Sequence, residues 1–248
     1  MSQNTVSVRK QIRELLESGE PPATLEKTLD EIESAELLHA VFQLSEAEQR
    51  LLLSAIASER AAHLVEEFPS SHGADLIEDM SPQEAAPILE EMASNFRVDV
   101  LSEMDRVDTE AILEHLEEED VQEIRELIAY PADVAGGLMM TEFATYPKTS
   151  LVRDVVEDLT GREGDYEFLT VHYIYVVVKK HLLVGVVRLR DLVFADPEAR
   201  IGDVATKAMS VSANTSLAEL EQFFAENDIA AVPVVDHRNY LLGIVRRR

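Results

Sequence analysis

The side chains of this sequence that could do chemistry are mainly carboxylates: 48 Asp and Glu stand against 22 Lys and Arg, a formal net charge of −26. Carboxylate oxygens are ligands for hard cations. The surplus charge argues against nucleic acid or an anionic membrane surface as a partner, because both would be repelled. Cations are the expected counterpart.

Other reactive groups have little support. The sequence has no Cys, which excludes disulfides and thiolate catalysis. Its seven His residues show neither His-x-His nor His-Glu-x-x-His spacing. Gly136-Gly137 lacks the Lys-Ser/Thr of a phosphate-binding loop and is interpreted as a turn, and no Gly-x-Ser-x-Gly nucleophile motif occurs. We therefore expect a binding protein and not an enzyme.

The carboxylates are concentrated in one half of the chain. Up to Tyr130 there are 31 acidic and 9 basic residues, a net charge of −22, whereas from Pro131 there are 17 acidic and 13 basic, a net of −4. A single carboxylate is commonly part of a solvated face, and the general acidity of a halophile would spread evenly. The excess in one half instead stores repulsion that counter-ions, salt or a basic partner would relieve.

The acidic half carries a sequence repeat with a period of twelve. Its eight segments, from LHAVFQL at Leu38 to QEIRELI at Gln122, share apolar residues at places 3, 4 and 7. The single exception at these places is Arg125, although only 46% of the whole chain is apolar. This spacing places one apolar stripe on each short helix.

Such short helices are unstable alone, so the repeat predicts an all-α superhelical solenoid of paired helices. Ser45 with Glu48, and Ser81 with Glu84, have the spacing of capping boxes at helix starts. The recurring Met80, Met92 and Met104 are interpreted as ordinary core residues.

The composition changes near Pro131 to β-branched residues, which predicts a second domain. From Thr141 the sequence indicates two copies of a small α/β module, each an extended piece, a helix, a strand, a polar turn and a return strand. The strand pairs are 172–178 with 182–187, and 229–235 with 240–245. Both return strands share the frame Leu-Leu-(Val)-Gly-(Val/Ile)-Val. Continuous apolar strands of this kind predict sheets covered by helices.

The second half resembles a tandem pair of cystathionine β-synthase (CBS) domains. Residues 130–143, YPADVAGGLMMTEF, resemble the junction that precedes such a pair in the MgtE family of magnesium transporters and channels. Residues 173–177 and 185–192 also match that family, whose N-terminal domain is a superhelix of short helices. The resemblance implies an acidic α-helical superhelix at 1–130, a first CBS domain at 131–200, and a second at 201–248 that is truncated at its C-terminus.

The resemblance implies a cytosolic regulatory region, attached to a transmembrane pore domain of the full-length protein and homodimeric through its CBS domains. It would sense intracellular Mg²⁺ through acidic residues at the interface of the helical and CBS domains. It would then gate the pore, which this chain lacks. We expect a soluble chain on the cytoplasmic side of the cell membrane, and a fragment, because the second module has no closing helix to cover its sheet.

Four carboxylates are the candidate Mg²⁺ ligands: Glu84, Asp105, Asp108 and Asp228. The family often has an acidic cluster at the start of a repeat helix, where this chain reads QEAAP at 83–87 and keeps only Glu84. Acidic residues common early in the second CBS helix are replaced by Ser216 and Ala218. Asp228 does match a family carboxylate, so the ligand set is incomplete.

CBS modules also bind adenine nucleotides, through a hydroxyl residue three places after the Gly and an Asp six places after it. In the first module Asp191 stands at the Asp place, which implies contact with ribose, and Arg188 replaces the hydroxyl residue. An Arg could instead reach a phosphate. ATP or another adenine nucleotide is therefore a second candidate ligand. The alternative function is a freestanding soluble CBS protein that binds such a nucleotide and holds a protein partner with its solenoid.

Overall fold

The computed structural model describes residues 3–18, 22–161, 172–179 and 181–247. The chain divides into two compact units. The first consists of Met1–Met92 with Phe96–Arg125, and the second of Ala93–Asn95 with Glu126–Arg248.

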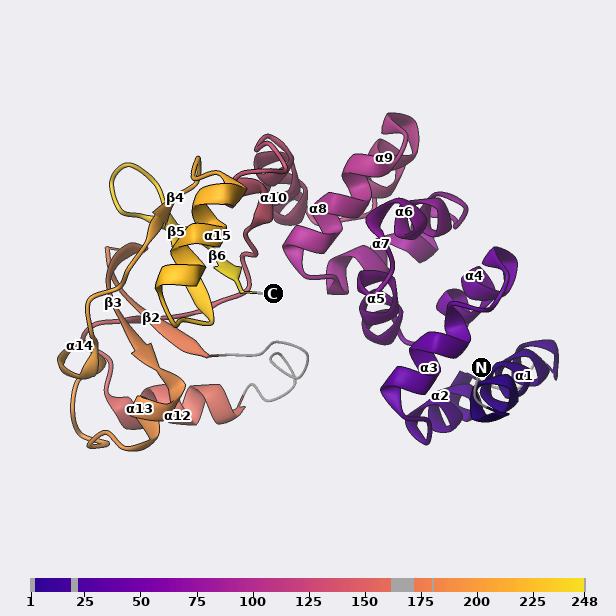
Figure 1. Cartoon of the computed structure of the whole chain (residues 1–248), viewed down its shortest axis with the longest axis horizontal. Helices are drawn as coiled ribbons and strands as arrows, with labels where there is room; N and C mark the ends of the chain where they lie inside the picture. Colours follow the sequence, from indigo (N-terminus) through magenta and orange to yellow (C-terminus); the bar gives the residue numbers. More distant parts are fainter. Residues whose placement is uncertain (1–2, 19–21, 162–171, 180, 248) are drawn as a thin grey trace. The chain divides into compact units, whose positions relative to one another are not determined.

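The first unit is built from short helices that follow one another along the chain (Figure 1). From α2 to α10 each helix begins one repeat period after the previous one. The predicted repeat is therefore confirmed, and it extends one helix further toward the N-terminus. The helices are α1 (Gln3–Ser18), α2 (Pro22–Asp30), α3 (Ser34–Val41), α4 (Glu46–Ala55), α5 (Ser58–Glu66), α6 (Ser70–Glu78), α7 (Pro82–Glu91), α8 (Ser94–Glu103), α9 (Arg106–Leu113) and α10 (Glu118–Ile128).

The apolar stripe of the repeat forms the core of this unit. All eight residues at place 3 are buried, as are seven of those at place 4; the eighth is Arg125, which is exposed. The residues at place 7 were predicted to lie on the helices with places 3 and 4. In most repeats, however, the helix ends before it reaches place 7. Met80, for example, follows the last residue of α6, Glu78, and is buried from the connecting turn.

Helices two repeats apart pack together, α4 against α6, α5 against α7 and α7 against α9. This is the arrangement expected of a solenoid with two repeats per helix pair. Arginines also join helices three apart, α1 to α4 and α5 to α2: Arg13 Nη2 lies 3.0 Å from Glu48 Oε2, and Arg60 Nε lies 2.8 Å from Glu26 Oε2. Arg50 also pairs with Asp79.

Both predicted capping boxes form. In each, the serine hydroxyl faces the third backbone N–H of the helix and the glutamate carboxylate accepts from the serine N–H. Pro82 is the first residue of α7, where its missing N–H has no helical partner to lose. These caps explain why the helices start where the repeat predicts.

The second unit holds two modules with the same element order. The first has β1 (Ala144–Pro147), α12 (Val152–Gly161), β2 (Tyr173–Val178), β3 (Leu182–Arg188) and α13 (Leu189–Val193). The second has β4 (Val211–Ser212), α15 (Leu217–Glu226), β5 (Ala231–Val235) and β6 (Leu241–Arg246). Two short helices, α11 (Ala135–Leu138) and α14 (Ile201–Val204), precede the modules. Among the described residues, no helix after β6 corresponds to α13.

Each module contains a three-stranded sheet, in the orders β1-β2-β3 and β4-β5-β6. The first pair in each sheet is parallel and the second is an antiparallel hairpin. Helices α12 and α13 lie beside β2 and β3 (Figure 1), where Val155 and Leu192 are buried against Ile174. A further cluster joins the two modules and includes Tyr175, Leu183 and Ile244.

The segment that leads into each module pairs with the other module. Met140, before the first module, exchanges two backbone hydrogen bonds of 2.9 Å with Ile244 in β6. Thr206, before the second module, exchanges two of 2.9 Å with Val186 in β3. The glycine of the shared strand frame is explained by this exchange. A Cβ at Gly243 would lie 2.7 Å from Met139 Sδ, and one at Gly185 would lie 2.9 Å from Ala205 Cβ.

Candidate functional site

The candidate metal ligands in the helical unit are exposed carboxylates at helix starts. Glu84 is the third residue of α7, where its Oε2 accepts from the hydroxyl of Ser81 at 2.6 Å and from its N–H at 3.2 Å. These hydrogen bonds hold the pKa of Glu84 below its ordinary value. Its carboxylate is thus already used as a helix cap, although an exposed oxygen can still meet a hydrated ion.

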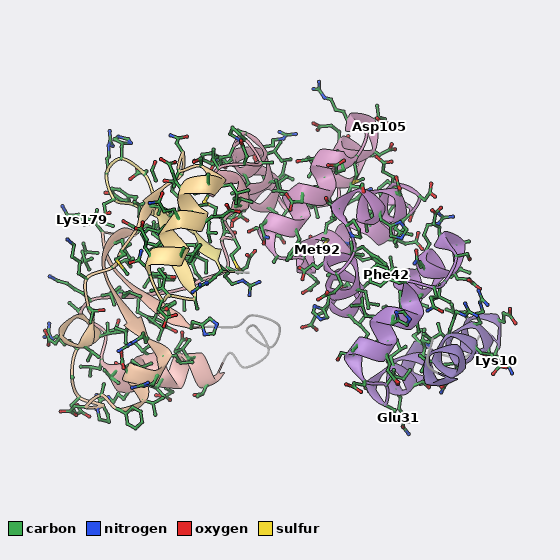
Figure 2. The ribbon with its side chains drawn as sticks, in the orientation of Figure 1. Lys10, Glu31, Phe42, Met92, Asp105 and Lys179 are labelled. Atoms are coloured by element: carbon green, nitrogen blue, oxygen red, sulfur yellow. The ribbon has the colours of Figure 1, made fainter. Side chains whose placement is uncertain are left out.

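Asp105 and Asp108 flank the start of α9, with Asp105 (labelled in Figure 2) at the cap position and Asp108 in the first turn. The Asp105 side chain makes no capping hydrogen bond. Its backbone N–H donates to the carboxylate of Glu78, which brings a third acidic side chain to the same helix start. Asp105 and Asp108 are exposed and Glu78 is half-buried, so any ion bound here keeps part of its water shell.

Asp228 belongs to the second unit and follows α15. Its side chain is fully exposed, and its Oδ1 lies 3.7 Å from Arg247 Nη1. Over the described ranges, no group of three or more His, Asp or Glu side chains is arranged to hold a metal ion. The assignment of Glu84, Asp105, Asp108 and Asp228 as ligands therefore stays a prediction.

A buried guanidinium lies among carboxylates elsewhere in the helical unit. The Arg97 side chain on α8 is only 5% exposed; its Nη2 lies 3.6 Å from Glu123 Oε2 and its Nη1 lies 4.0 Å from Asp120 Oδ1. Its Nε is buried without a hydrogen-bond partner. Burial, and then the charges of Asp120 and Glu117, raise the pKa of Glu90 in the same region. In this cluster the buried positive charge of Arg97 offsets part of the negative charge of the surrounding carboxylates.

The second unit has an open pocket of about 430 Å³ with a basic lining. Two arginines, a histidine and a tyrosine contribute, and the lining residues are His172, Tyr173, Arg188, Leu189, Arg190, Val193 and Ala230. Cationic and aromatic side chains in one pocket suit a ligand that has both a negative charge and a flat ring.

The two predicted nucleotide residues lie together at this pocket. Arg188 Nε donates to Asp191 Oδ2 at 2.6 Å across the end of β3 and the first turn of α13. The Asp191 carboxylate raises the pKa of Arg188 above its ordinary value, so the guanidinium stays charged. Arg188 lines the pocket, whereas Asp191 does not line it and instead pairs with the Arg188 guanidinium.

Ala230 connects the pocket to both modules. Its backbone N–H donates to the Tyr173 hydroxyl at 3.2 Å, and its carbonyl accepts from the Arg247 N–H at 2.8 Å. The pocket wall is therefore formed mainly by the first module, and the second module contributes Ala230, which precedes β5.

Sequence patterns did not reveal several buried polar groups. Gln49 is 2% exposed, and its side chain donates to the Val41 carbonyl and pairs with the His72 ring. The Tyr175 hydroxyl is buried without a partner, and burial raises the pKa of Tyr175 well above its ordinary value. Arg97 stands in the repeat sequence FRVDV with nothing that marks it as buried. For the pocket residue Arg190, the sequence feature that could have indicated its role is its position next to Asp191.

No helix in the described ranges has the length and apolar character needed to cross a membrane.

Two family models match the chain. The model for the MgtE intracellular N domain matches residues 31–133, and the model for the CBS domain matches residues 201–248. The magnesium transporter MgtE of Thermus thermophilus is 38% identical over 124 residues, 50% of this chain and 27% of the relative. That of Enterococcus faecalis is 36% identical over 128 residues, 51% of this chain and 28% of the relative. The matched segments thus span less than a third of these relatives.

Solved structures match almost the whole chain. The crystal structure of the soluble part of a magnesium transporter is 27% identical, with a TM-score of 0.87 over 98% of this chain and 94% of that one. The cytosolic domain of the Mg²⁺ channel MgtE in complex with ATP is 28% identical, with a TM-score of 0.84 over 96% of each chain. These matches confirm the predicted fold class, a helical superhelix followed by CBS modules. The chain therefore carries an MgtE intracellular N domain at residues 31–133 and a CBS domain at residues 201–248, in the fold of the cytosolic part of a magnesium transporter.

Proposed function

We propose that this chain is the regulatory region of a magnesium transporter and binds Mg²⁺ through carboxylates of its helical unit. In this role it gates a transmembrane pore outside this chain, and it does not catalyse a reaction. The observation that carries the proposal is the match of 98% of the chain to the soluble part of a magnesium transporter. The charge supports it, because 31 of the 48 acidic residues lie in the first 130.

Electrostatics supplies the mechanism. Carboxylates held close together repel one another, and a divalent ion relieves that repulsion best in the arrangement that brings them together. An ion that binds one arrangement of the two units more tightly than another raises the population of that arrangement. Exposed carboxylates such as Asp105 and Asp108 make weak, hydrated sites, and weak sites respond to changes of the ion within its cellular range.

Limited proteolysis tests this sensing role. The chain is digested with and without millimolar Mg²⁺, with Na⁺ at equal ionic strength as the control for screening. We expect Mg²⁺ to slow cleavage between the units, around residues 126–133, more than Na⁺ does. Equal protection by the two salts would contradict Mg²⁺ sensing by this chain.

A variant pair tests the ligands. Asp105→Asn with Asp108→Asn should raise the Mg²⁺ concentration needed for half-maximal protection several-fold. The matched control is Glu118→Gln with Glu119→Gln, which removes the same charge from exposed positions in the first turn of α10. If both pairs shift the midpoint equally, general charge and not these ligands governs the response.

A second ligand is favoured by the pocket beside Ala230. We propose that it takes an adenine nucleotide, with Tyr173 against the base, Arg188 and Arg190 toward phosphate, and Asp191 holding the Arg188 guanidinium in place. The support is the basic and aromatic lining, together with the ATP complex of the related cytosolic domain. Nucleotide binding is compatible with both candidate functions, the regulatory region of a transporter and the freestanding CBS protein, so it does not distinguish between them.

Calorimetric titration with ATP tests the pocket. Arg190→Ala should weaken ATP binding about tenfold or more, because a charge-assisted contact to phosphate is lost. Arg238→Ala is the matched control, since Arg238 lies in the turn between β5 and β6 and does not line the pocket. Absence of heat with the unaltered chain would remove the nucleotide proposal and leave the magnesium proposal standing.

Homodimer formation is a further part of the proposal. The side chains of Val193 and Phe194 are 70% and 82% exposed, next to the pocket at the end of α13. A second copy that covers them would bury apolar surface from water. Sedimentation of the chain should show a dimer that Phe194→Glu weakens. A monomer at high concentration would contradict this part.

A further inference from the structure

The junction before the first module is bound to the second module. Ala135 N–H donates to the Thr215 carbonyl at 2.7 Å, and Gly136 N–H donates to the Ala213 carbonyl at 2.8 Å. At the end of the junction, Met140 exchanges its two hydrogen bonds with Ile244 in β6. The segment that precedes the first module in sequence is therefore held by β4, β6 and the start of α15.

The residues that follow Met140 hold Ser94. The Glu142 carboxylate accepts from the Ser94 N–H at 2.9 Å and from the Ser94 hydroxyl at 3.1 Å. The Thr141 N–H donates to the Ser94 hydroxyl oxygen at 2.9 Å. Ser94 is fully buried, so these three hydrogen bonds satisfy polar groups that water does not reach.

Glu142 is suited to this role by charge as well as by distance. Ser94 is the first residue of α8, where backbone N–H groups lack helical partners and the helix dipole favours a negative charge. A hydrogen bond to an ionised carboxylate is about twice as strong as a neutral one. Ala93 and the first two residues of α8 belong to the second unit, whereas α8 from Phe96 onward belongs to the first.

We propose that Glu142 is a positioning residue, which fixes Ala93–Asn95 to the second unit, and that the second module, through the pairing of β6 with Met140, holds Glu142 in place. A change at β6 would then reach Ser94 through Met140, Thr141 and Glu142, an unbroken series of backbone and side-chain contacts. The proposal concerns this connection alone and requires neither Mg²⁺ nor a nucleotide to bind.

Hydrogen exchange of the whole chain tests the role of Glu142. Glu142→Ala should speed exchange of the amides at 93–97 about tenfold or more, because Ser94 loses a charged acceptor. Glu142→Gln should restore part of the protection, since the amide oxygen still accepts from the Ser94 N–H. Glu221→Ala, at an exposed position on α15, is the matched control and should change nothing there.

Two equivalent glycines test the part played by the second module. In the second module, Gly243→Ala places a Cβ 2.8 Å from the Met140 carbonyl oxygen. In the first module, Gly185→Ala places one 3.1 Å from the Thr206 carbonyl oxygen. Gly243→Ala should speed exchange at 93–97 even though Glu142 is intact, and Gly185→Ala should not.

The proposal is overturned if Glu142→Ala leaves exchange at 93–97 unchanged, or speeds it equally in all strands of both sheets. It is also overturned if the two glycine variants act alike on 93–97. If a glycine variant does not fold, the Glu142 variants decide the outcome, because that side chain is only partly buried and its loss leaves the strands intact.

Discussion

The guanidinium of Arg97 lies 3.6 Å from the carboxylate of Glu123, in a pair whose positive member is buried and whose negative member reaches water. The exposed fractions of the side chains are 5% and 35%. Because of this difference in exposure, losing the partner of Arg97 and losing the partner of Glu123 should not cost the same free energy of unfolding. A cation left alone in the interior costs far more than a carboxylate left alone at the surface.

Asp120→Asn with Glu123→Gln should therefore lower the free energy of unfolding of the helical unit by about 2–3 kcal/mol, because it removes the two carboxylates that pair with the buried Arg97 guanidinium. Arg97→Met should cost less than about 1 kcal/mol, since methionine fills a similar volume and the carboxylates stay hydrated. Urea unfolding followed by circular dichroism measures both. A larger loss with Arg97→Met would refute the asymmetry.

The ion pair between Arg13 and Glu48 predicts a dependence on pH. The guanidinium and the Ser45 N–H lower the pKa of Glu48 from 4.5 to about 2. A carboxyl with a depressed folded-state pKa stabilises the fold fully above its unfolded value, and the stabilisation is lost as the pH falls from about 4.5 to about 2. Glu48→Gln should cost about 1–2 kcal/mol at neutral pH and progressively less within that window.

Thermal unfolding of Glu48→Gln at several pH values checks this prediction. Glu46→Gln is the control, because Glu46 lies in the same helical turn but has no ion pair among the described residues. A stability difference between Glu48→Gln and the unaltered chain that stays constant down to pH 2 would show that the pair is not the cause.

Glu84 can be tested as a cap and as a ligand separately. Glu84→Ala removes half of the capping box with Ser81 and should lower the stability of the helical unit by about 0.5–1 kcal/mol. If the carboxylate acts only as a cap, the loss is the same in Mg²⁺ and in a chelator. A loss that grows with Mg²⁺ would make Glu84 a ligand.

The paired glycines of the junction are required by close contacts. A Cβ at Gly137 would lie 2.2 Å from the Pro131 carbonyl oxygen, and one at Gly136 would lie 2.4 Å from the Tyr130 ring. Gly137→Ala should lower the unfolding free energy of the second unit by about 2 kcal/mol or more, because a backbone atom must move. Gly161→Ala, where a Cβ meets nothing within 4 Å, should be neutral or slightly stabilising.

Differential scanning calorimetry compares the two alanine variants. Equal melting temperatures for Gly137→Ala and Gly161→Ala would mean that the junction relaxes without cost and does not need its glycines.

Local periodicity was enough to predict most elements of this protein, but not α1, α2 or the short helix α11, which covers Gly136-Gly137 where the sequence indicated a turn. The regular spacing of helix starts follows from the apolar stripe and from serine caps such as Ser45, because both act within one or two turns. Strands such as β2 and β5 follow from β-branched runs between polar turns. Burial of the methionine series was predicted for the same reason.

The candidate sites were less predictable. The sequence placed Asp191 and Arg188 on adjacent elements, but it did not show that they pair with each other or that Arg190 and His172 line the same pocket. The carboxylates Asp105 and Asp108 were recognisable as acidic residues at a helix start, while the approach of Glu78 from α6 was not. These relations depend on how neighbouring elements pack.

By itself, then, the sequence determined the repeat and the module order, since both are written in spacing along the chain, and its resemblance to known sequences indicated the family. The tertiary structure decided that Arg97 is buried, that Ser94 is held by Glu142 and that the junction pairs with β6. Those contacts join residues far apart in the chain, and hydrogen bonding and burial across such separations leave no periodic signal in the residues themselves.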